Sequence, residues 1–199
     1  MTDEPTAADP TAADPGAADP AAADPAAALH ALLAATVAHL ESVGARDEAL
    51  AVVKDPRGIG PFKTQTSMQP TGRAYRLGVI LLDTEGRLFR VGKITRATET
   101  GWPQNLSASV EQRRADRRAA SRGHFVDGDV VNYGHVEIPQ DREHLTADSD
   151  PVSFDGEHFF IRWGTTRSER RRLDLYLADR SELLETERIW DDPRWPDAD

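Results

Sequence analysis

One stretch, residues 73–97, constrains the fold most strongly because it carries the densest apolar run in the chain. Residues 75–82 are too continuously apolar for a strand with one face in water, and such strands are usually covered on both faces. Residues 83–87 supply a turn in which Gly86 takes the left-handed conformation, and residues 88–94 continue as a return strand. The stretch therefore predicts a hairpin at the centre of a sheet.

The other elements are predicted from apolar spacing, capping residues and turn residues. Gly78 and Gly92 lie inside the hairpin strands and mark a bulge or a place where another backbone comes close. Asp24 ahead of Pro25 caps a first helix. The full set consists of helices over residues 25–43, 46–54, 107–122 and 173–185, a loop over 55–72, a strand over 129–138 and a second hairpin over 152–163. This pattern predicts a single α+β domain over about residues 26–186, with a mostly antiparallel sheet and three or four packed helices.

Both ends of the chain differ in composition from this domain. Residues 6–25 are four near-copies of the pentapeptide TAADP, and a Pro every five residues prevents a continuous helix. Because this segment has nothing apolar to bury, residues 1–25 are predicted to form a disordered acidic tether. Residues 187–199 are predicted to form an acidic tail that contains Trp and Pro.

The net charge of −10 hides a strong segregation of charge along the chain. Residues 1–56 carry a net charge of −8, residues 57–122 a net charge of +8 and residues 123–199 a net charge of −10. A basic middle between acidic flanks predicts a surface that attracts anions. The acidic tether is expected to compete weakly for that surface, because ion pairs between exposed groups are screened by salt.

The basic residues of the middle segment concentrate on the helix predicted over residues 107–122. Its five arginines cover about half of the helix circumference, and Ala108, Ala115 and Ala119 lie opposite them to pack on the sheet. Guanidinium groups bind phosphates and carboxylates bidentately, which favours an anion-binding face. The alternative is a solvated face, in which the arginines pair with Glu111 and Asp116. The candidate anion-binding residues are Arg113, Arg114, Arg117, Arg118 and Arg122, extended by Lys93 and Arg96 of the hairpin.

Several functional classes require residues that this chain lacks. There is no Cys, so there is no thiolate nucleophile and no Cys-based zinc site. No apolar run reaches the roughly 18–20 residues that span a bilayer, and the N-terminus has no secretory signal. His135 and Glu137 share one side of a strand, but no paired-His or HExxH spacing supports a metal site or a proton-transfer pair there. We expect no catalytic residue, no metal, no cofactor and no membrane partner, and we expect a cytoplasmic location.

The order of several segments resembles a known group of proteins. These segments are RLGVILL, LFRVGKITRA, a Trp/Pro loop, an Arg- and Ala-rich helix that ends at Arg122-Gly123, and FVDGDV. Over about residues 29–185 the chain resembles small proteins of GC-rich, actinobacterial-type bacteria, some of which are labelled glutaminase. The resemblance implies an amidohydrolase activity but carries over no catalytic residue. The chain has no Ser three residues ahead of any Lys, so it lacks the Ser-x-x-Lys nucleophile of one glutaminase class.

Three functions remain open from the sequence. The one that we favour is a binding or regulatory module without catalysis, which uses the basic helix toward an anionic ligand, a nucleic acid or an acidic protein. The second is a small amidohydrolase, as the resemblance implies. The third is a protein–protein adaptor that is anchored by Trp102 or by Trp190 and Trp195.

Overall fold

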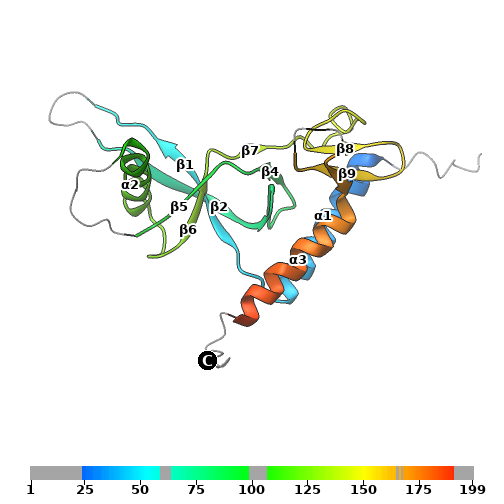
Figure 1. Ribbon diagram of the computed structural model, residues 1–199, viewed down its shortest axis with the longest axis horizontal. Helices are drawn as coiled ribbons and strands as arrows, with labels where there is room; N and C mark the ends of the chain where they lie inside the picture. The colour runs from blue at the N-terminus through cyan, green and yellow to red at the C-terminus, as the bar shows by residue number, and fades with distance from the viewer. Residues whose placement is uncertain (1–23, 59–63, 99–106, 165, 167, 191–199) are drawn as a thin grey trace, which may run out of the picture.

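The computed structural model describes residues 24–58, 64–98, 107–164, 166 and 168–190 (Figure 1). The elements in chain order are α1 (Pro25–Ser42), β1 (Glu48–Lys54), β2 (Ser67–Leu77), β3 (Ile80–Asp83), β4 (Leu88–Arg90), β5 (Lys93–Arg96), α2 (Ala108–Ser121), β6 (Val130–Tyr133), β7 (Val136–Glu137), β8 (Val152–Phe154), β9 (Phe159–Arg162), β10 (Arg170–Arg172) and α3 (Leu173–Trp190). The predicted α+β class is confirmed, as are three of the four predicted helices. Most of the predicted tether and tail, residues 1–23 and 191–199, lies outside the described residues, and α3 runs past the predicted helix end at residue 185.

Seven strands form one curled sheet in the order β5-β6-β1-β2-β3-β4-β7. Neighbouring strands are antiparallel except for β1 and β6, which are parallel. β4 leads into β5, and β6 leads into β7, through breaks of two residues. The segment β4–β5 therefore runs alongside the segment β6–β7, since β4 pairs with β7 and β5 pairs with β6. These pairings curl the sheet back on itself. The strand predicted over residues 129–138 is present as β6 and β7.

The predicted central hairpin is present, but it contains more strands than its apolar pattern indicates. The apolar run is split, since β2 ends at Leu77 and β3 begins at Ile80, with Gly78 in the left-handed region at φ 67°. The hydroxyl of Tyr176 in α3 holds this turn, because it donates to Leu77 O at 2.8 Å and accepts from Val79 N at 3.1 Å. A turn that depends on a side chain 99 residues away leaves little local signal in the sequence.

The return strand also differs from the prediction. The turn over residues 83–87 is confirmed, with Gly86 at φ 81°, but the strand that follows is interrupted between β4 and β5. β5 lies at the far end of the strand order, where it pairs with β6. The backbone at Gly92 lies against Gly134, and an added Cβ would come within 2.4 Å of the Gly134 carbonyl group. The close backbone approach predicted at Gly92 is therefore confirmed, and it is the place where the chain bends.

The helix predicted over residues 46–54 is wrong, because these residues contribute β1, which lies between β2 and β6 in the sheet. The loop predicted over residues 55–72 is wrong in its second half, because β2 begins at Ser67. Glu, Ala and Leu in the segment EALAVVK favour a helix locally. β1 is nevertheless a strand, because it pairs with one strand on each side and this pairing overrides the local preference. Both errors have the same cause, since β1 and the first half of β2 form one antiparallel pair.

An apolar core joins α1 and α3, which lie side by side, to the strands β2–β4 (Figure 1). Asp24 accepts a hydrogen bond from Ala26 N at 3.2 Å, which confirms the predicted N-cap of α1. The fully buried leucines of this core include Leu33, Leu40, Leu77, Leu82, Leu88 and Leu177. No helix in the described part of the chain is long and apolar enough to cross a membrane.

A second sheet of three strands, in the order β10-β9-β8, packs beside α3. β8 and β9 form the hairpin predicted over residues 152–163. The arginines of β10 have partners within the chain: Arg171 and Arg172 pair with carboxylates of α3, and the Arg170 guanidinium lies 4.5 Å from the centroid of the Phe160 ring. This basic cluster is therefore largely neutralised by its surroundings.

Candidate anion-binding pocket

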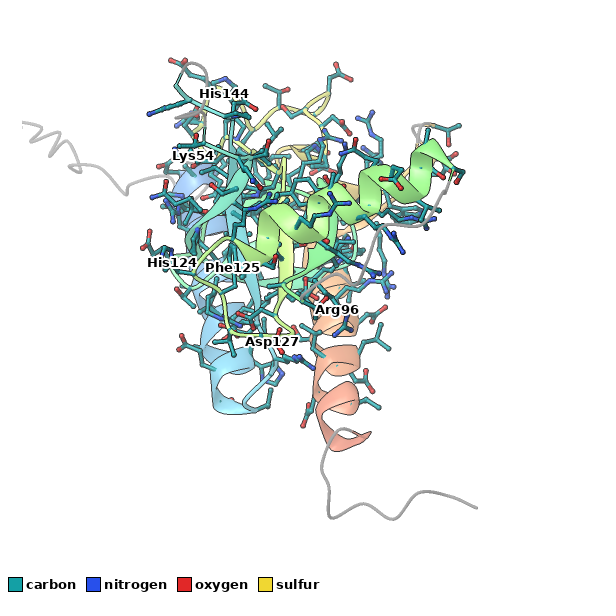
Figure 2. The ribbon with its side chains drawn as sticks, turned by 90° about the vertical axis from the view of Figure 1, so that its left-hand side faces the viewer. Lys54, Arg96, His124, Phe125, Asp127 and His144 are labelled. Carbon is teal, nitrogen blue, oxygen red and sulfur yellow. The ribbon has the colours of Figure 1, made fainter. Side chains whose placement is uncertain are left out.

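α2 lies across one face of the curled sheet (Figure 2). Ala119 and Ala120 are its buried residues and pack against β1, β2 and β6. The prediction that Ala108 and Ala115 also pack on the sheet is wrong, since both are exposed. The physical reason is that only the C-terminal end of α2 lies over the sheet. The earlier turns of α2 lie beside β5, which is an edge strand.

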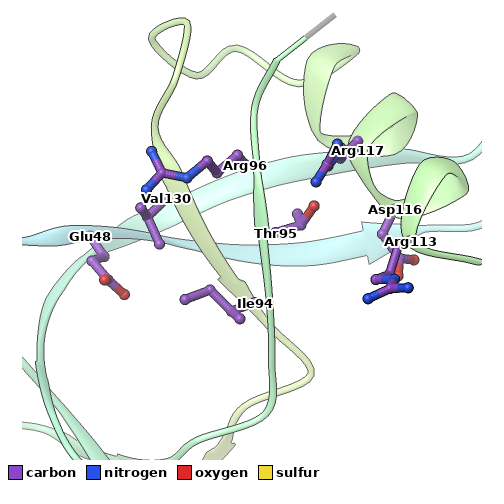
Figure 3. Close-up of a pocket in the computed structure, with 8 residues that line it drawn as sticks. All are labelled: Glu48, Ile94, Thr95, Arg96, Arg113, Asp116, Arg117 and Val130. Atoms are coloured by element: carbon purple, nitrogen blue, oxygen red, sulfur yellow. The ribbon is translucent and has the colours of Figure 1, made fainter. Parts of the chain in front are cut away.

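A pocket of about 370 Å³ lies between α2 and β5 (Figure 3). It is lined by Glu48, Ile94, Thr95, Arg96, Arg113, Asp116, Arg117 and Val130. Figure 3 shows Arg113 and Arg117 extending from α2 on one side of β5, whereas Arg96 and Glu48 lie on the other side. The same pocket reaches both sides of β5, and β6 closes one edge of this strand. The pocket therefore runs around the other edge of β5, which does not pair with β6.

The three arginines of the pocket form no ion pair within the described part of the chain. Arg96, Arg113 and Arg117 are exposed, and none of them forms a side-chain hydrogen bond or an ion pair with a described residue. Three guanidinium groups around one pocket repel one another, and this repulsion is relieved when an anion binds among them.

Two carboxylates also line the pocket, but neutral donors rather than arginines hold them. Asn132 Nδ2 donates to Glu48 Oε2 at 2.7 Å. Gln112 Nε2 donates to Asp116 Oδ1 at 2.9 Å, and the hydroxyl of Tyr133 also hydrogen-bonds to Asp116. Burial, followed by this hydrogen bond and by the charge of Asp116, raises the pKa of the Tyr133 hydroxyl well above its ordinary value. The pocket thus combines free guanidinium groups with two carboxylates that have their own partners.

Asn132 is the centre of a polar network inside the curled sheet, and its side chain is fully buried. Its Oδ1 accepts from Arg76 Nη1 at 2.5 Å while its Nδ2 donates to Glu48. The three residues come from β6, β2 and β1, which are neighbours in the order β6-β1-β2. This network fixes the Glu48 carboxylate in the pocket wall.

Four of the predicted anion-binding residues do not line the pocket. Arg114 and Arg118 are half-buried on α2. Arg122 Nη1 donates to Thr66 O at 2.9 Å, beside the start of β2. Lys93 is exposed at the start of β5. The basic face that the helix pattern predicts is therefore divided, and only the arginines at positions 96, 113 and 117 converge.

Glu48, Asn132 and Ile94 belong to the site but were not predicted from the sequence. The helix predicted over residues 46–54 places Glu48 on the wrong kind of element. Ile94 is 49 % exposed and supplies an apolar surface in the pocket. Asn132, a polar residue inside the apolar strand VVNY, is the one signal that indicates a buried polar network.

His135, considered above for a metal or proton-transfer site, packs instead against an aromatic ring. Its ring centroid lies 5.1 Å from that of Phe89, in an edge-on arrangement, and its Nδ1 has no hydrogen-bond partner among the described residues. Burial lowers the pKa of His135, and a backbone hydrogen bond at Asn132 partly opposes this effect. Within the described residues, no group of three or more His, Asp or Glu side chains is placed to hold a metal ion.

No protein family, curated protein or solved structure matches this chain. The resemblance to glutaminase-labelled proteins therefore stays a prediction. The chemistry of the pocket is the remaining guide to function: three guanidinium groups that form no ion pair with a described residue, two carboxylates held by neutral donors and an exposed apolar side chain.

Proposed function

We propose that this protein is a binding module that holds an anionic ligand in the pocket between α2 and β5, without catalysis of its own. The observation that carries the proposal is that Arg96, Arg113 and Arg117 line one pocket and form no ion pair with a described residue, so that three cations face two carboxylates there. A guanidinium group can hold a carboxylate or a phosphate through two parallel hydrogen bonds. The ligand would supply the missing counter-charge.

The charge distribution of the chain supports the same proposal. Most of the pocket residues come from the segment 57–122, which carries a net charge of +8 in a protein whose total charge is −10. A hydrogen bond to a charged group contributes about 1.5–3 kcal/mol, so two arginines on one anion contribute roughly 3–6 kcal/mol. This range corresponds to dissociation constants from about millimolar to tens of micromolar. A tighter ligand would need further contacts along the pocket.

Isothermal titration calorimetry with citrate and with pyrophosphate, at about 50 mM and about 200 mM salt, tests the proposal. The test variant is Arg113→Ala with Arg117→Ala, because alanine favours the helix and both side chains are exposed. The matched control is Arg57→Ala with Arg142→Ala, which removes the same charge at exposed positions outside the pocket.

We expect at least one of the two anions to bind, more weakly at the higher salt concentration. We expect a loss of about a hundredfold or more in the test variant, as the removal of two charged hydrogen bonds predicts, and little change in the control. Equal losses in both variants would mean that only the overall charge matters, and they would refute a pocket-specific ligand. An ammonia-release assay with glutamine on the same samples tests the amidohydrolase alternative.

A further inference from the structure

We infer that the anionic ligand of this pocket is an extended acidic segment of a partner protein, which adds as a strand to the free edge of β5. The inference rests on the proposed function, because it identifies the ligand of the same pocket. It is carried by the backbone of β5, which stands at one end of the sheet order and pairs with β6 alone among the described strands.

The hydrogen bonds at the end of β5 show which of its backbone groups point away from the sheet. Ala97 N donates to Asp129 O at 2.9 Å, and Gly128 N donates to Ala97 O at 2.8 Å, so Ala97 bonds toward β6. In antiparallel strands, residues that bond to one neighbour alternate with residues whose N–H and C=O point the other way. Thr95 therefore bonds toward β6, whereas the N–H and C=O of Ile94 point toward the free edge.

Arg96 shares the outward direction of Ile94. Its carbonyl accepts a hydrogen bond from Thr98 N at 3.0 Å, which lies outside the β5–β6 ladder. The N–H of Arg96 and both backbone groups of Ile94 thus face an edge that no strand of the described part of the chain covers. Unpaired groups at alternate residues of an edge strand are what an added strand pairs with.

The side chains on the two sides of β5 differ, and the difference selects the ligand. On the α2 side, Arg113 and Arg117 are four residues apart, about 6 Å along the axis, and neither forms an ion pair with a described residue. On the other side, Ile94 is exposed, and Arg96 and Glu48 carry opposite charges, so that this side has no excess positive charge to attract an acidic side chain. Side chains of an added strand alternate between the two sides, with same-side neighbours roughly 6.6–6.8 Å apart. The fitting segment therefore alternates acidic residues, toward the arginines, with apolar residues, toward Ile94.

Fluorescence anisotropy with the full-length protein and a labelled heptapeptide that alternates Glu with Val tests the inference. A second probe has the same sequence with N-methyl groups on the backbone nitrogens of the residues that would bond to β5. A third probe keeps the composition but groups the Glu residues together. The protein variants are Ile94→Pro, which removes an outward N–H without removing a bond to β6, and Ile94→Ala as its matched control.

We expect the alternating peptide to bind the unaltered protein and to bind the Ile94→Ala variant a few-fold more weakly, because alanine removes the apolar contact but keeps the outward N–H. We expect losses of about tenfold or more for the methylated peptide and for Ile94→Pro. The grouped peptide should also bind more weakly. If Ile94→Pro fails to fold by circular dichroism, the comparison of the parent and methylated peptides decides alone.

Three results would overturn the inference while leaving the proposed function intact. The first is equal binding of the parent and methylated peptides. The second is binding of citrate or pyrophosphate together with no binding of any peptide. The third is that the protein binds labelled duplex DNA, or associates with itself, and that an excess of the alternating peptide does not compete with this binding. The absence of binding to every anion and every peptide would refute both proposals.

Discussion

Replacing Asn132 with alanine tests directly how the pocket wall is held. Asn132 is fully buried and makes two hydrogen bonds to charged groups, with Arg76 Nη1 at 2.5 Å and with Glu48 Oε2 at 2.7 Å. Each such bond is worth about 1.5–3 kcal/mol. The released arginine and carboxylate carry opposite charges and attract each other, which offsets part of the loss. We therefore expect the free energy of unfolding to fall by about 2–4 kcal/mol.

Urea denaturation measured by circular dichroism and by Trp fluorescence gives this quantity, provided that the two transitions coincide. A double-mutant cycle with Glu48→Ala isolates the Asn132–Glu48 term, for which we expect a coupling energy of about 1 kcal/mol or more. Asn132→Asp is a control of the same shape that places a second carboxylate against Glu48. Its stability deficit should shrink as the pH falls, because protonation of one carboxylate removes the repulsion.

A loss below about 1 kcal/mol for Asn132→Ala would refute the reasoning, because losses of this size are typical of sites outside such a network. Strict additivity with Glu48→Ala would refute it as well, since residues that share a hydrogen bond are expected to couple. In either case the Glu48 carboxylate would have to be held by some other contact.

Two further predictions concern side chains outside the pocket. Tyr176→Phe removes the donor to Leu77 O and the acceptor for Val79 N, so we expect unfolding by urea to show a loss of about 1–3 kcal/mol, and an unchanged midpoint would contradict this role. His135 has a pKa that burial lowers, so its imidazole signal in NMR should titrate below the value measured for the urea-unfolded chain. The sign follows from linkage: the folded state prefers neutral His135, so its contribution is complete above the unfolded pKa and is lost as the pH falls toward the folded pKa. A folded midpoint at or above the unfolded one would be inconsistent with burial.

The hydrogen bonds of the two pocket carboxylates explain why the pocket arginines form no ion pair with a described residue. Glu48 and Asp116, the two carboxylates of the pocket, are satisfied by Asn132, Gln112 and Tyr133. Amide and phenol donors hold a carboxylate in place without neutralising an arginine. The pocket therefore keeps both a fixed shape and an unbalanced positive charge, which is the combination that an anion-binding site needs.

Features that depend on neighbouring residues could be predicted from the sequence alone. The Asp24 cap, the turn that contains Gly86, the span of α2 and the β8–β9 hairpin were all predictable, because capping, turn geometry and helical periodicity act within a few residues. The alternation of apolar residues was also sufficient for the α+β class.

Only the tertiary structure decided which segments meet. The segment at residues 48–54 has good helix formers, and it becomes a strand because β2 and β6 pair with it from distant parts of the chain. The same pairing brings Glu48 beside Ile94 and Val130, and the packing of Ala119 and Ala120 on the sheet carries the arginines of α2 to the edge of β5. Pairing and packing energies between distant segments are absent from any local window of sequence. The sequence therefore indicated seven basic candidates, five on the helix and two on the hairpin, and the fold places three of them around one pocket.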